Sequence, residues 1–316
     1  MSACGIEEIR QARETIRPAV VRTPLVFSER LSEETGADIY LKLEGFQRTG
    51  AFKFRGAYNC VSRLGREALS AGLVTASSGN HALGMSLAAR MHGVRAVVVM
   101  PHSAPAAKQE RARTYGATVI LHGSIYDEAY DHAQFLASKH GMTFVPSFDH
   151  PLIIAGQGTV GLEILEQEPG LDLIVTPVGG GGLLAGLLIA AAGVEVVGVQ
   201  AEGAAAMARS LERGERHVLA SAATVADGIA TLKPGAITFD IASRYQARVV
   251  TVSDAQLLQA MTRLLATGVV AEPAAAAGVA ALREVLPVAG RKVACVVTGG
   301  NVSGTFLAKA ATGLPG

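Results

Sequence analysis

The sequence predicts an α/β fold built on mostly parallel strands, because short apolar runs alternate with segments of helical spacing. Runs that are apolar on both faces and separated by helices are typical of a parallel sheet covered on both sides. The runs are RAVVVM at 95–100, ATVILH at 117–122, DLIVTPV at 172–178, VEVVGVQ at 194–200 and KVACVVT at 292–298.

Two of the intervening segments show clear helical spacing. Apolar residues recur at intervals of three and four in 83–91 and again in 257–265. Gly93 and Gly268 follow these segments, where a glycine often ends a helix.

The chain has 316 residues, of which 49% are hydrophobic, and this length exceeds the usual size of one domain. No proline-rich linker or charge block divides it, so a second domain is expected to be inserted rather than appended. We expect a large domain of residues 1–71 plus 148–316 and an inserted small domain of residues 72–147.

Composition excludes several classes of partner. The formal net charge is only +1, with both signs mixed along the chain, so neither nucleic acid nor a membrane surface is an expected partner. Cys4, Cys60 and Cys295 lie far apart, which argues against a disulfide framework or a zinc site. The first residues carry early charges of both signs and predict no secretory signal. We therefore expect a cytoplasmic protein that acts on small molecules.

Four consecutive glycines, Gly179 to Gly182, lie between a predicted strand and an apolar helix in VTPVGGGGLLAGLL. Without Cβ atoms the backbone can approach an anion, and the N–H groups at the helix start can surround it. The motif lacks the Lys-Ser/Thr pair of a nucleotide triphosphate loop and the order of a dinucleotide fingerprint. A phosphate cradle is the functional interpretation, and a flexible turn or tight packing is the alternative.

Three further segments carry candidate chemistry. Lys53 lies between two phenylalanines, where a desolvated amine could attack an aldehyde, although such a lysine can also lie at the surface. SSGNHALG at 77–84 could present N–H groups and side chains to a carboxylate, or could simply be a capped helix start. CVVTGGN at 295–301 ends a buried strand with the neutral hydroxyl of Thr298.

Taken in order, AFKFRGA, SSGNHALG, PVGGGGLLAG and CVVTGGN resemble the four markers of the fold-type II pyridoxal-phosphate enzymes. The chain is most similar to the threonine and serine dehydratase and serine racemase group, and the similarity runs nearly end to end. AGQGT at 155–159, VADGIA at 225–230 and EPAAAA at 272–277 also fit. The resemblance implies the tryptophan synthase β-like fold, with two open, twisted, mostly parallel sheets flanked by helices.

The resemblance also implies roles for individual residues. Lys53 would form the Schiff base with pyridoxal 5'-phosphate, Asn80 would bond the cofactor's phenolic oxygen, and Thr298 would face the pyridine nitrogen. Phe52 would pack beside the lysine. The phosphate would be held by backbone N–H groups of Gly179, Gly180, Gly181, Gly182 and Leu183. The substrate carboxylate would be bound by Ser77, Ser78, Gly79, Asn80 and His81.

These roles imply a reaction. The amine of Lys53, displaced by the substrate, would take the α-proton, and the cofactor would accept the electrons. A neutral hydroxyl at Thr298 would not keep the pyridine nitrogen protonated, which favours prompt loss of a β-leaving group. We expect loss of water from serine, threonine or a bulkier β-hydroxy amino acid such as phenylserine or a hydroxyectoine-derived one. The products are a 2-oxo acid and ammonia.

The sequence departs from the group at three places. Leu83 replaces the usual glutamine that helps bind a nucleotide effector, so ATP regulation is not expected. Glu202 and the Ala206 carbonyl could bind magnesium or another divalent cation, but Ala208 replaces the second acidic residue. The printed chain ends soon after its last predicted helix, which predicts no regulatory domain and a catabolic or specialised role.

The sequence is also compatible with other functions. Ser78 lies where a hydroxyl could return the proton to the opposite face of the α-carbon, so a serine-type amino-acid racemase with side dehydratase activity is the second hypothesis. A nucleotide-binding α/β oxidoreductase or a small-molecule binding protein is a more remote one. The resemblance also predicts a homodimer or a homotetramer.

Overall fold

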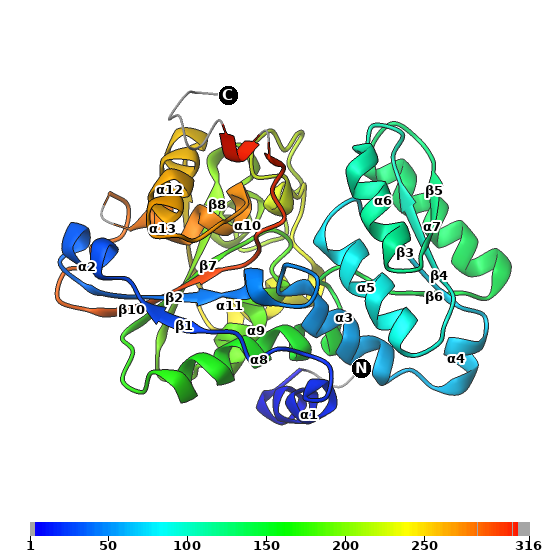
Figure 1. Cartoon of the computed structure of the whole chain (residues 1–316), viewed down its shortest axis with the longest axis horizontal. Helices are drawn as coiled ribbons and strands as arrows, with labels where there is room; N and C mark the ends of the chain where they lie inside the picture. The colour runs from blue at the N-terminus through cyan, green and yellow to red at the C-terminus, as the bar shows by residue number, and fades with distance from the viewer. Residues whose placement is uncertain (1–3, 283, 305, 309–316) are drawn as a thin grey trace. The chain divides into compact units, whose positions relative to one another are not determined.

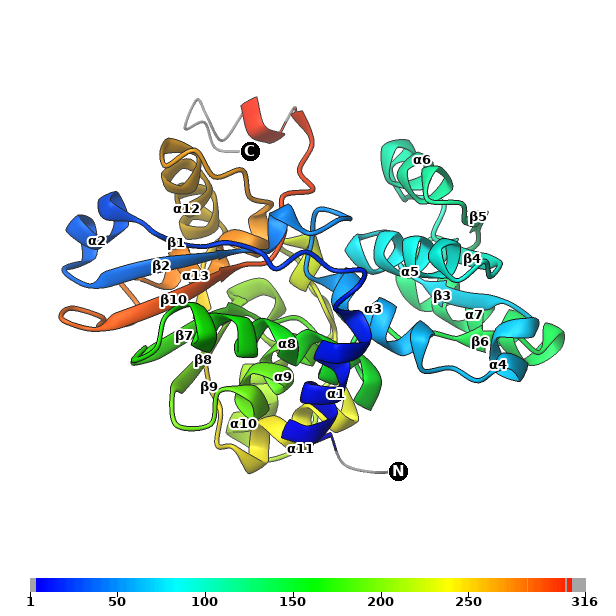
Figure 2. The ribbon, with the colours of Figure 1, turned by 60° about the horizontal axis from the view of Figure 1, so that its bottom comes forward.

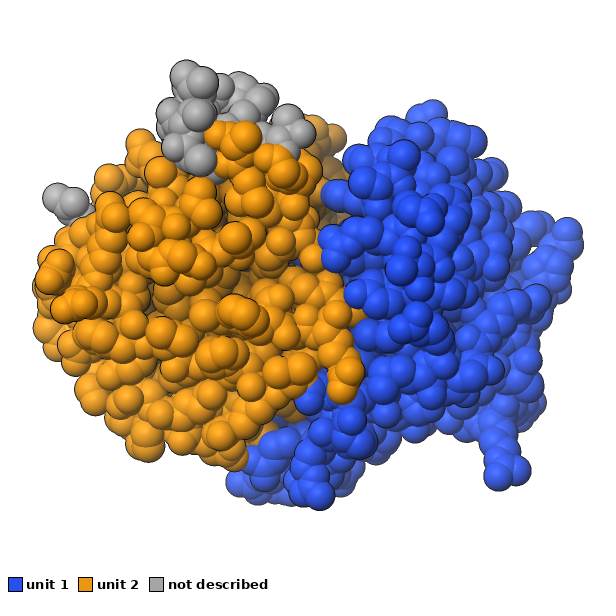
Figure 3. All heavy atoms as spheres, in the orientation of Figure 1, with its two compact units in different colours: residues 1–20, 53–157 blue, residues 21–52, 158–316 orange. Residues whose placement is uncertain are grey.

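The computed structural model describes residues 4–282, 284–304 and 306–308. The chain divides into two compact units, residues 1–20 with 53–157 and residues 21–52 with 158–316, coloured separately in Figure 3. The predicted insert 72–147 lies wholly in the first unit, and its status as a separate domain stays a prediction.

The first unit is built on a parallel sheet with the strand order β5-β4-β3-β6 (Figure 1). Its elements are α1 (Ile6–Ile16), α3 (Lys53–Ser62), α4 (Arg66–Ser70), β3 (Leu73–Ala76), α5 (Asn80–Met91), β4 (Ala96–Met100), α6 (Ala106–Thr114), β5 (Thr118–Leu121), α7 (Tyr126–His140) and β6 (Thr143–Phe144).

Helices cover both faces of this sheet. Val74 and Val97 face one side, where they pack with Ala133 of α7. Leu73 and Val98 face the other side and belong to a cluster that includes side chains of α3 and α5. The alternation of faces along each strand explains why the strands are apolar throughout.

The second unit contains the strand order β1-β2-β10-β7-β8-β9, in which only the β1–β2 pair is antiparallel (Figure 2). Its strands are β1 (Leu25–Phe27), β2 (Asp38–Leu43), β7 (Leu173–Pro177), β8 (Glu195–Ala201), β9 (Arg248–Val252) and β10 (Lys292–Val297). Its α-helices are α2 (Glu29–Thr35), α9 (Gly182–Ala190), α10 (Ala206–Arg213), α11 (Ala236–Arg244), α12 (Asp254–Ala266) and α13 (Ala277–Ala281). The described residues of this unit also form the 3-10 helices η1 (Glu44–Phe46), η2 (Glu202–Ala204), η3 (Asp227–Ile229) and η4 (Pro273–Ala276).

This sheet is also covered on both faces. Val175 and Val197 pack in one cluster with Met261 of α12. Ile174 and Val196 face the opposite side and pack in a cluster with helices α8 and α9. The helix α8 (Pro151–Gln167) begins in the first unit and continues in the second.

The predicted architecture is confirmed. All five predicted strands are present as β4, β5, β7, β8 and β10, and both predicted helices are present as α5 and α12. Gly93 and Gly268 follow these helices with φ values of 67° and 79°, the left-handed conformation expected after a helix. Within the residues that the structure describes, no helix is both long and apolar enough to cross a membrane.

Helix α3 is held by unusually close backbone contacts at glycines. A Cβ atom on Gly156 of α8 would lie 2.6 Å from the Cα of Gly56 in α3. A Cβ atom on Gly84 of α5 would lie 3.1 Å from the Phe54 nitrogen and 3.2 Å from the Lys53 carbonyl carbon. Side chains at these two positions would therefore push against the backbone of α3.

Gly156→Ala tests this constraint. Alanine improves helix propensity by about 1 kcal/mol, but the new methyl group meets backbone atoms that cannot rotate away. We expect the free energy of unfolding, measured by urea denaturation, to fall by about 1 to 3 kcal/mol. Gly65→Ala is the control, because a Cβ there meets nothing within 4 Å. Equal stability of the two variants would contradict the prediction.

A buried ion pair ties strand β2 to helix α8 within the second unit. Lys42 of β2 is fully buried, and its Nζ donates hydrogen bonds to Glu163 Oε2 at 2.7 Å, Gln167 Oε1 at 2.8 Å and the Thr23 carbonyl at 2.8 Å. Three acceptors match the three N–H donors of the ammonium group, which offsets the cost of removing it from water.

Lys42→Met should be strongly destabilising because it leaves the Glu163 carboxylate without its cation. We expect a loss of about 3 to 5 kcal/mol in the free energy of unfolding. The double variant Lys42→Met/Glu163→Leu should recover most of this loss, since it removes both charges of the pair together. Glu14→Gln, which removes the exposed ion pairs of Glu14 with Arg13 at 3.7 Å and with Arg17 at 3.4 Å, should cost less than about 1 kcal/mol. A Lys42→Met loss no larger than this control would disprove the role of the pair.

Candidate functional site

The structure places the sequence-predicted site residues in two groups, one in each unit. Lys53 and the loop 77–81 belong to the first unit. Phe52, the loop 179–183 and Thr298 belong to the second, as do the candidate metal ligands. The boundary between the units thus falls between Phe52 and Lys53 along the chain.

Lys53 is the first residue of α3 and is half-buried rather than enclosed. Its Nζ donates a hydrogen bond to the carbonyl oxygen of Ser147 at 2.9 Å. Ser147 follows the end of β6, and no sequence motif predicts this contact. The amine is therefore held by a neutral acceptor of the backbone.

The loop 77–79 follows β3, the strand that pairs in parallel with β6 through Leu73 and Thr143. The segments after these two strands consequently leave the same edge of the sheet, where ligands of α/β proteins commonly bind. Ser77 Oγ accepts a hydrogen bond from the Gly79 N–H at 3.2 Å, and Gly79 caps the start of α5. Residues 77–80 are all half-buried, so the predicted strand, loop and helix start are present and partly accessible.

His81 is buried and neutral. Burial lowers the pKa of its imidazole to about 3, and the positive charge of Lys53 acts in the same direction. Its Nε2 lies 3.1 Å from the Val145 carbonyl oxygen, which can only accept, so Nε2 carries the proton. Nδ1 is then an acceptor, and it has no partner among the described residues. At neutral pH the ring therefore carries one proton, on Nε2, and has no proton on Nδ1 to donate.

The glycine loop joins β7 to α9, as predicted. Gly181 caps α9 with φ of 97°, and a Cβ there would lie 2.5 Å from Met207 Cε and 2.9 Å from Thr238 Cβ. The Gly180 carbonyl oxygen accepts hydrogen bonds from Thr238 Oγ1 at 2.6 Å and from the Gly235 N–H at 3.2 Å. The first N–H groups of a helix have no acceptor inside it, so those of α9 are suited to an anion.

Thr231 supplies an independent sign of a ligand beside this loop. Its methyl carbon lies 3.5 Å from the position of a Cβ on Gly179. Its hydroxyl is buried without a hydrogen-bond partner in the part of the chain that the structure describes. An unpaired buried hydroxyl is costly unless a bound group satisfies it. The loop therefore fits a phosphate, and Thr231 is a residue that the sequence motifs did not reveal.

Thr298 lies directly after β10 and is only 4% exposed. Its carbonyl oxygen accepts the backbone N–H of Phe52 at 3.0 Å, and the neighbouring Gly299 bridges to Ala51. Phe52 is half-buried against the cluster that contains Leu183. The strand end thus fixes Phe52 and Thr298 relative to each other.

The candidate metal ligands are less favourably placed. Glu202 is exposed in η2, and the Ala206 carbonyl oxygen, in the first turn of α10, already accepts a 2.6 Å hydrogen bond from Ser210 Oγ. No group of three histidine, cysteine or acidic side chains suited to a metal occurs within 4–282, 284–304 and 306–308.

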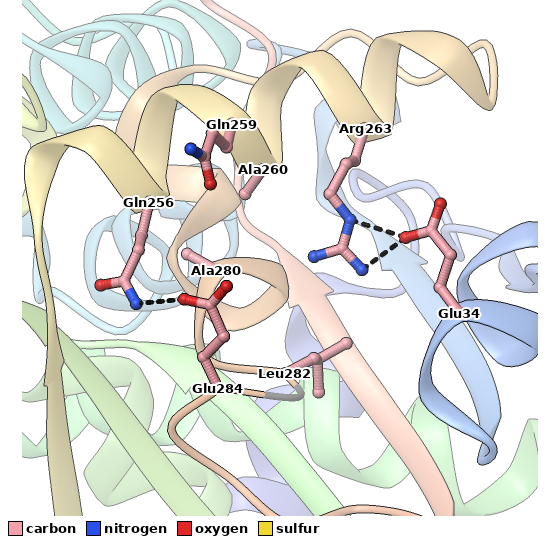
Figure 4. A pocket seen from close by; sticks show the side chains of 8 residues that line it. All are labelled: Glu34, Gln256, Gln259, Ala260, Arg263, Ala280, Leu282 and Glu284. Atoms are coloured by element: carbon pink, nitrogen blue, oxygen red, sulfur yellow. Dashed lines mark hydrogen bonds and ion pairs between the residues drawn. The ribbon is translucent and has the colours of Figure 1, made fainter.

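A pocket of the second unit contains none of the predicted site residues (Figure 4). It has a volume of about 240 Å³. Arg263 Nη2 contacts Glu34 Oε2 at 2.7 Å, and Gln256 Nε2 donates to Glu284 Oε2 at 2.9 Å, so its polar groups largely bond one another.

Comparison with known proteins agrees with the geometry. Residues 16–299 match the family model of the pyridoxal-phosphate dependent enzymes. The chain is 46% identical over 302 residues to an L-threonine ammonia-lyase of Thermotoga maritima. The aligned region covers 94% of this chain and 75% of that one. It is 40% identical over 308 residues to an L-threo-3-hydroxyaspartate ammonia-lyase of a Pseudomonas species, covering 96% and 97%.

Solved structures show the same relationship. A maize serine racemase superposes with a TM-score of 0.93 at 33% identity, covering 98% of each chain. A threonine deaminase of Solanum lycopersicum superposes with a TM-score of 0.91 at 34% identity, covering 99% of this chain and 95% of that one. The family model, the sequence relatives and the fold thus confirm the resemblance: this chain belongs to the pyridoxal-phosphate dependent enzymes, in the threonine dehydratase and serine racemase group.

Proposed function

We propose that this enzyme is an ammonia-lyase that removes water from a β-hydroxy amino acid and releases a 2-oxo acid and ammonia. The observation that carries the proposal is the match, over more than nine tenths of the chain, to relatives named for threonine and for threo-3-hydroxyaspartate. L-threonine, L-serine and L-threo-3-hydroxyaspartate are the first substrates to test. Phenylserine and hydroxyectoine-derived amino acids are the bulkier candidates.

Lys53 is the proposed anchor and base. Lys53 is half-buried, so an aldehyde can reach its amine. In the contact with Ser147 the amine meets a neutral carbonyl oxygen rather than a carboxylate. When it is released from the cofactor, the same amine can take the α-proton of the substrate. Pyridoxal phosphate, when bound, supplies an electron sink for the electron pair left on the α-carbon.

The other residues bind and orient. In our proposal, backbone N–H groups of the loop 179–183 bind the phosphate together with the Thr231 hydroxyl. Asn80 and Thr298 contact the ring of the cofactor, and Phe52 packs against it. The loop from Ser77 to His81 binds the substrate carboxylate through the N–H groups at the start of α5.

An amino-acid racemase remains the second candidate, because Ser78 provides a hydroxyl in the substrate loop and the maize serine racemase superposes over almost the whole chain. A serine that reprotonates the α-carbon would give the D-isomer alongside the 2-oxo acid. Chiral analysis of unreacted substrate distinguishes the two activities.

Three expectations stay predictions: a divalent cation at Glu202 and Ala206, assembly into a homodimer or homotetramer, and a cytoplasmic location.

The cysteines Cys4, Cys60 and Cys295 are free and buried, and burial raises the pKa of each thiol to about 12. Burial and a raised pKa both disfavour the thiolate, the form in which a cysteine acts as a nucleophile or a metal ligand.

The reaction is tested with a panel of β-hydroxy amino acids, measured by release of 2-oxo acid and ammonia with and without magnesium. We expect equimolar release of both products from at least one substrate. Lys53→Ala should lower turnover by about a thousandfold or more and abolish the visible absorption of the bound cofactor, because it removes both anchor and base. Lys139→Ala, a change of an exposed lysine, is the control. A colourless wild-type protein without lyase activity would refute the proposal.

The phosphate loop is tested by Gly181→Ala. The φ of 97° and the 2.5 Å approach to Met207 Cε both oppose a side chain, so the loop must shift. We expect the dissociation constant of pyridoxal phosphate to rise by about tenfold or more. Gly193→Ala is a matched control, because Gly193 has a φ of 101° but open space around its Cβ position. It should lower stability without changing cofactor affinity, and equal affinities in both variants would contradict the assignment.

A further inference from the structure

The segment 231–238 of the second unit contacts the glycine loop at both of its ends. At its start, the Thr231 methyl carbon lies 3.5 Å from the position of a Cβ on Gly179. At its end, the Thr238 hydroxyl donates a hydrogen bond to the Gly180 carbonyl oxygen at 2.6 Å. Thr238 lies in the first turn of α11, which packs against α9 and α10 (Figure 2). One neighbouring segment thus holds the loop for which we propose phosphate binding.

The contact with Thr238 is tight and fully buried. Thr238 is 0% exposed, and a Cβ on Gly181 would lie 2.9 Å from both its Cβ and its Oγ1. The Gly180 carbonyl oxygen also accepts the Gly235 N–H at 3.2 Å, so each of its two lone pairs has a donor. Turning this carbonyl would break two hydrogen bonds away from water, which is costly.

The direction of this carbonyl determines the direction of an N–H group. The peptide bond between Gly180 and Gly181 is trans, so its N–H points opposite to its carbonyl oxygen. Because α11 holds the oxygen, the Gly181 N–H points away from α11. The Gly181 carbonyl oxygen accepts the Ala185 N–H at 2.8 Å, and the Gly182 N–H therefore points out of the start of α9.

These residues have the backbone of an anion-binding nest. Gly181 is left-handed, with φ of 97° and ψ of 0°, and Gly182 is the first residue of α9. A left-handed residue next to a right-handed one turns successive N–H groups toward one concave side. The N–H groups of Gly181, Gly182 and Leu183 have no acceptor among the described residues, and all three residues are buried. Buried N–H groups of this kind are suited to an anion.

We infer that Thr238 is a positioning residue for the phosphate loop. Its hydroxyl holds the Gly180 carbonyl toward α11, so that the Gly181 N–H is presented to the cofactor phosphate. Without this bond the carbonyl oxygen, with its partial negative charge, is less restrained from turning toward the phosphate and opposing its binding. The inference rests on the proposed function, and it adds a residue that acts through the backbone of the loop rather than on the cofactor.

Variants of Thr238 are tested with ligands that differ only in the phosphate. Thr238→Val removes the hydroxyl and keeps the shape of the side chain, whereas Thr238→Ser keeps the hydroxyl. Thr143→Val is the matched control, because the Thr143 hydroxyl also donates to a backbone carbonyl, that of Ala68 at 2.8 Å, but in the first unit. The full chain of each variant is stripped of cofactor and titrated with pyridoxal phosphate and with pyridoxal. Visible absorption gives the two dissociation constants.

The preference for pyridoxal phosphate over pyridoxal, as a ratio of dissociation constants, reports on the phosphate site, because a general loss of stability weakens both ligands. Thr238→Val should lower this preference about five- to twentyfold, since the lost hydrogen bond orients a group that only the phosphate meets. Thr238→Ala removes the same hydroxyl and should give the same result where valine disturbs folding. Thr238→Ser and Thr143→Val should stay within about twofold of the wild-type preference.

A wild-type preference in Thr238→Val and Thr238→Ala would overturn the inference. So would a loss in Thr238→Ser as large as that in the valine variant, or an equal loss in Thr143→Val. A wild-type protein that binds pyridoxal as tightly as pyridoxal phosphate would instead refute the phosphate assignment of the glycine loop. Neither titration uses an amino-acid substrate, so the proposed lyase activity succeeds or fails separately.

Discussion

The close approach of three helix backbones is the constraint on which the candidate site depends. Helix α3 begins at Lys53, and it is contacted at van der Waals limits by α5 through Gly84 and by α8 through Gly156. Interiors are packed too densely to absorb an extra methyl group at such contacts without moving a backbone. The place where the Lys53 side chain leaves the backbone is therefore determined by residues that carry no functional group at all.

Several candidate site residues have neutral groups among their described contacts, or are themselves neutral. Lys53 meets a carbonyl, His81 is held uncharged by burial, and Thr298 offers a hydroxyl at the end of β10. The glycine loop, for which we propose phosphate binding, presents backbone N–H groups at the start of α9 rather than a lysine or arginine side chain.

The sequence was most informative where local pattern and chemistry coincide. The apolar strands and the glycine loop were predictable, because a buried parallel strand and a phosphate loop each have a local signature. Strand β2 was missed, since Lys42 makes DIYLKL look polar and its partner Glu163 lies 121 residues further along the chain. Strand β6 was missed because it has only two residues.

The candidate site residues that the sequence did not predict lack a local signature. Ser147 contributes a carbonyl, a group that every residue possesses, and Thr231 is notable only because its hydroxyl is buried without a described partner. Motifs reveal side chains that act by type, whereas these residues act by position, which only the folded chain defines.

The strand order of the second unit has a consequence for synthesis of the protein. Strand β10, residues 292–297, lies between β2 and β7 and pairs with both. When the ribosome has made β2 and β7, the strand that joins them does not yet exist, and each presents an unpaired edge. The nascent chain therefore carries two open strand edges until residues 292–297 have emerged, and unpaired edges of this kind are prone to aggregation during synthesis.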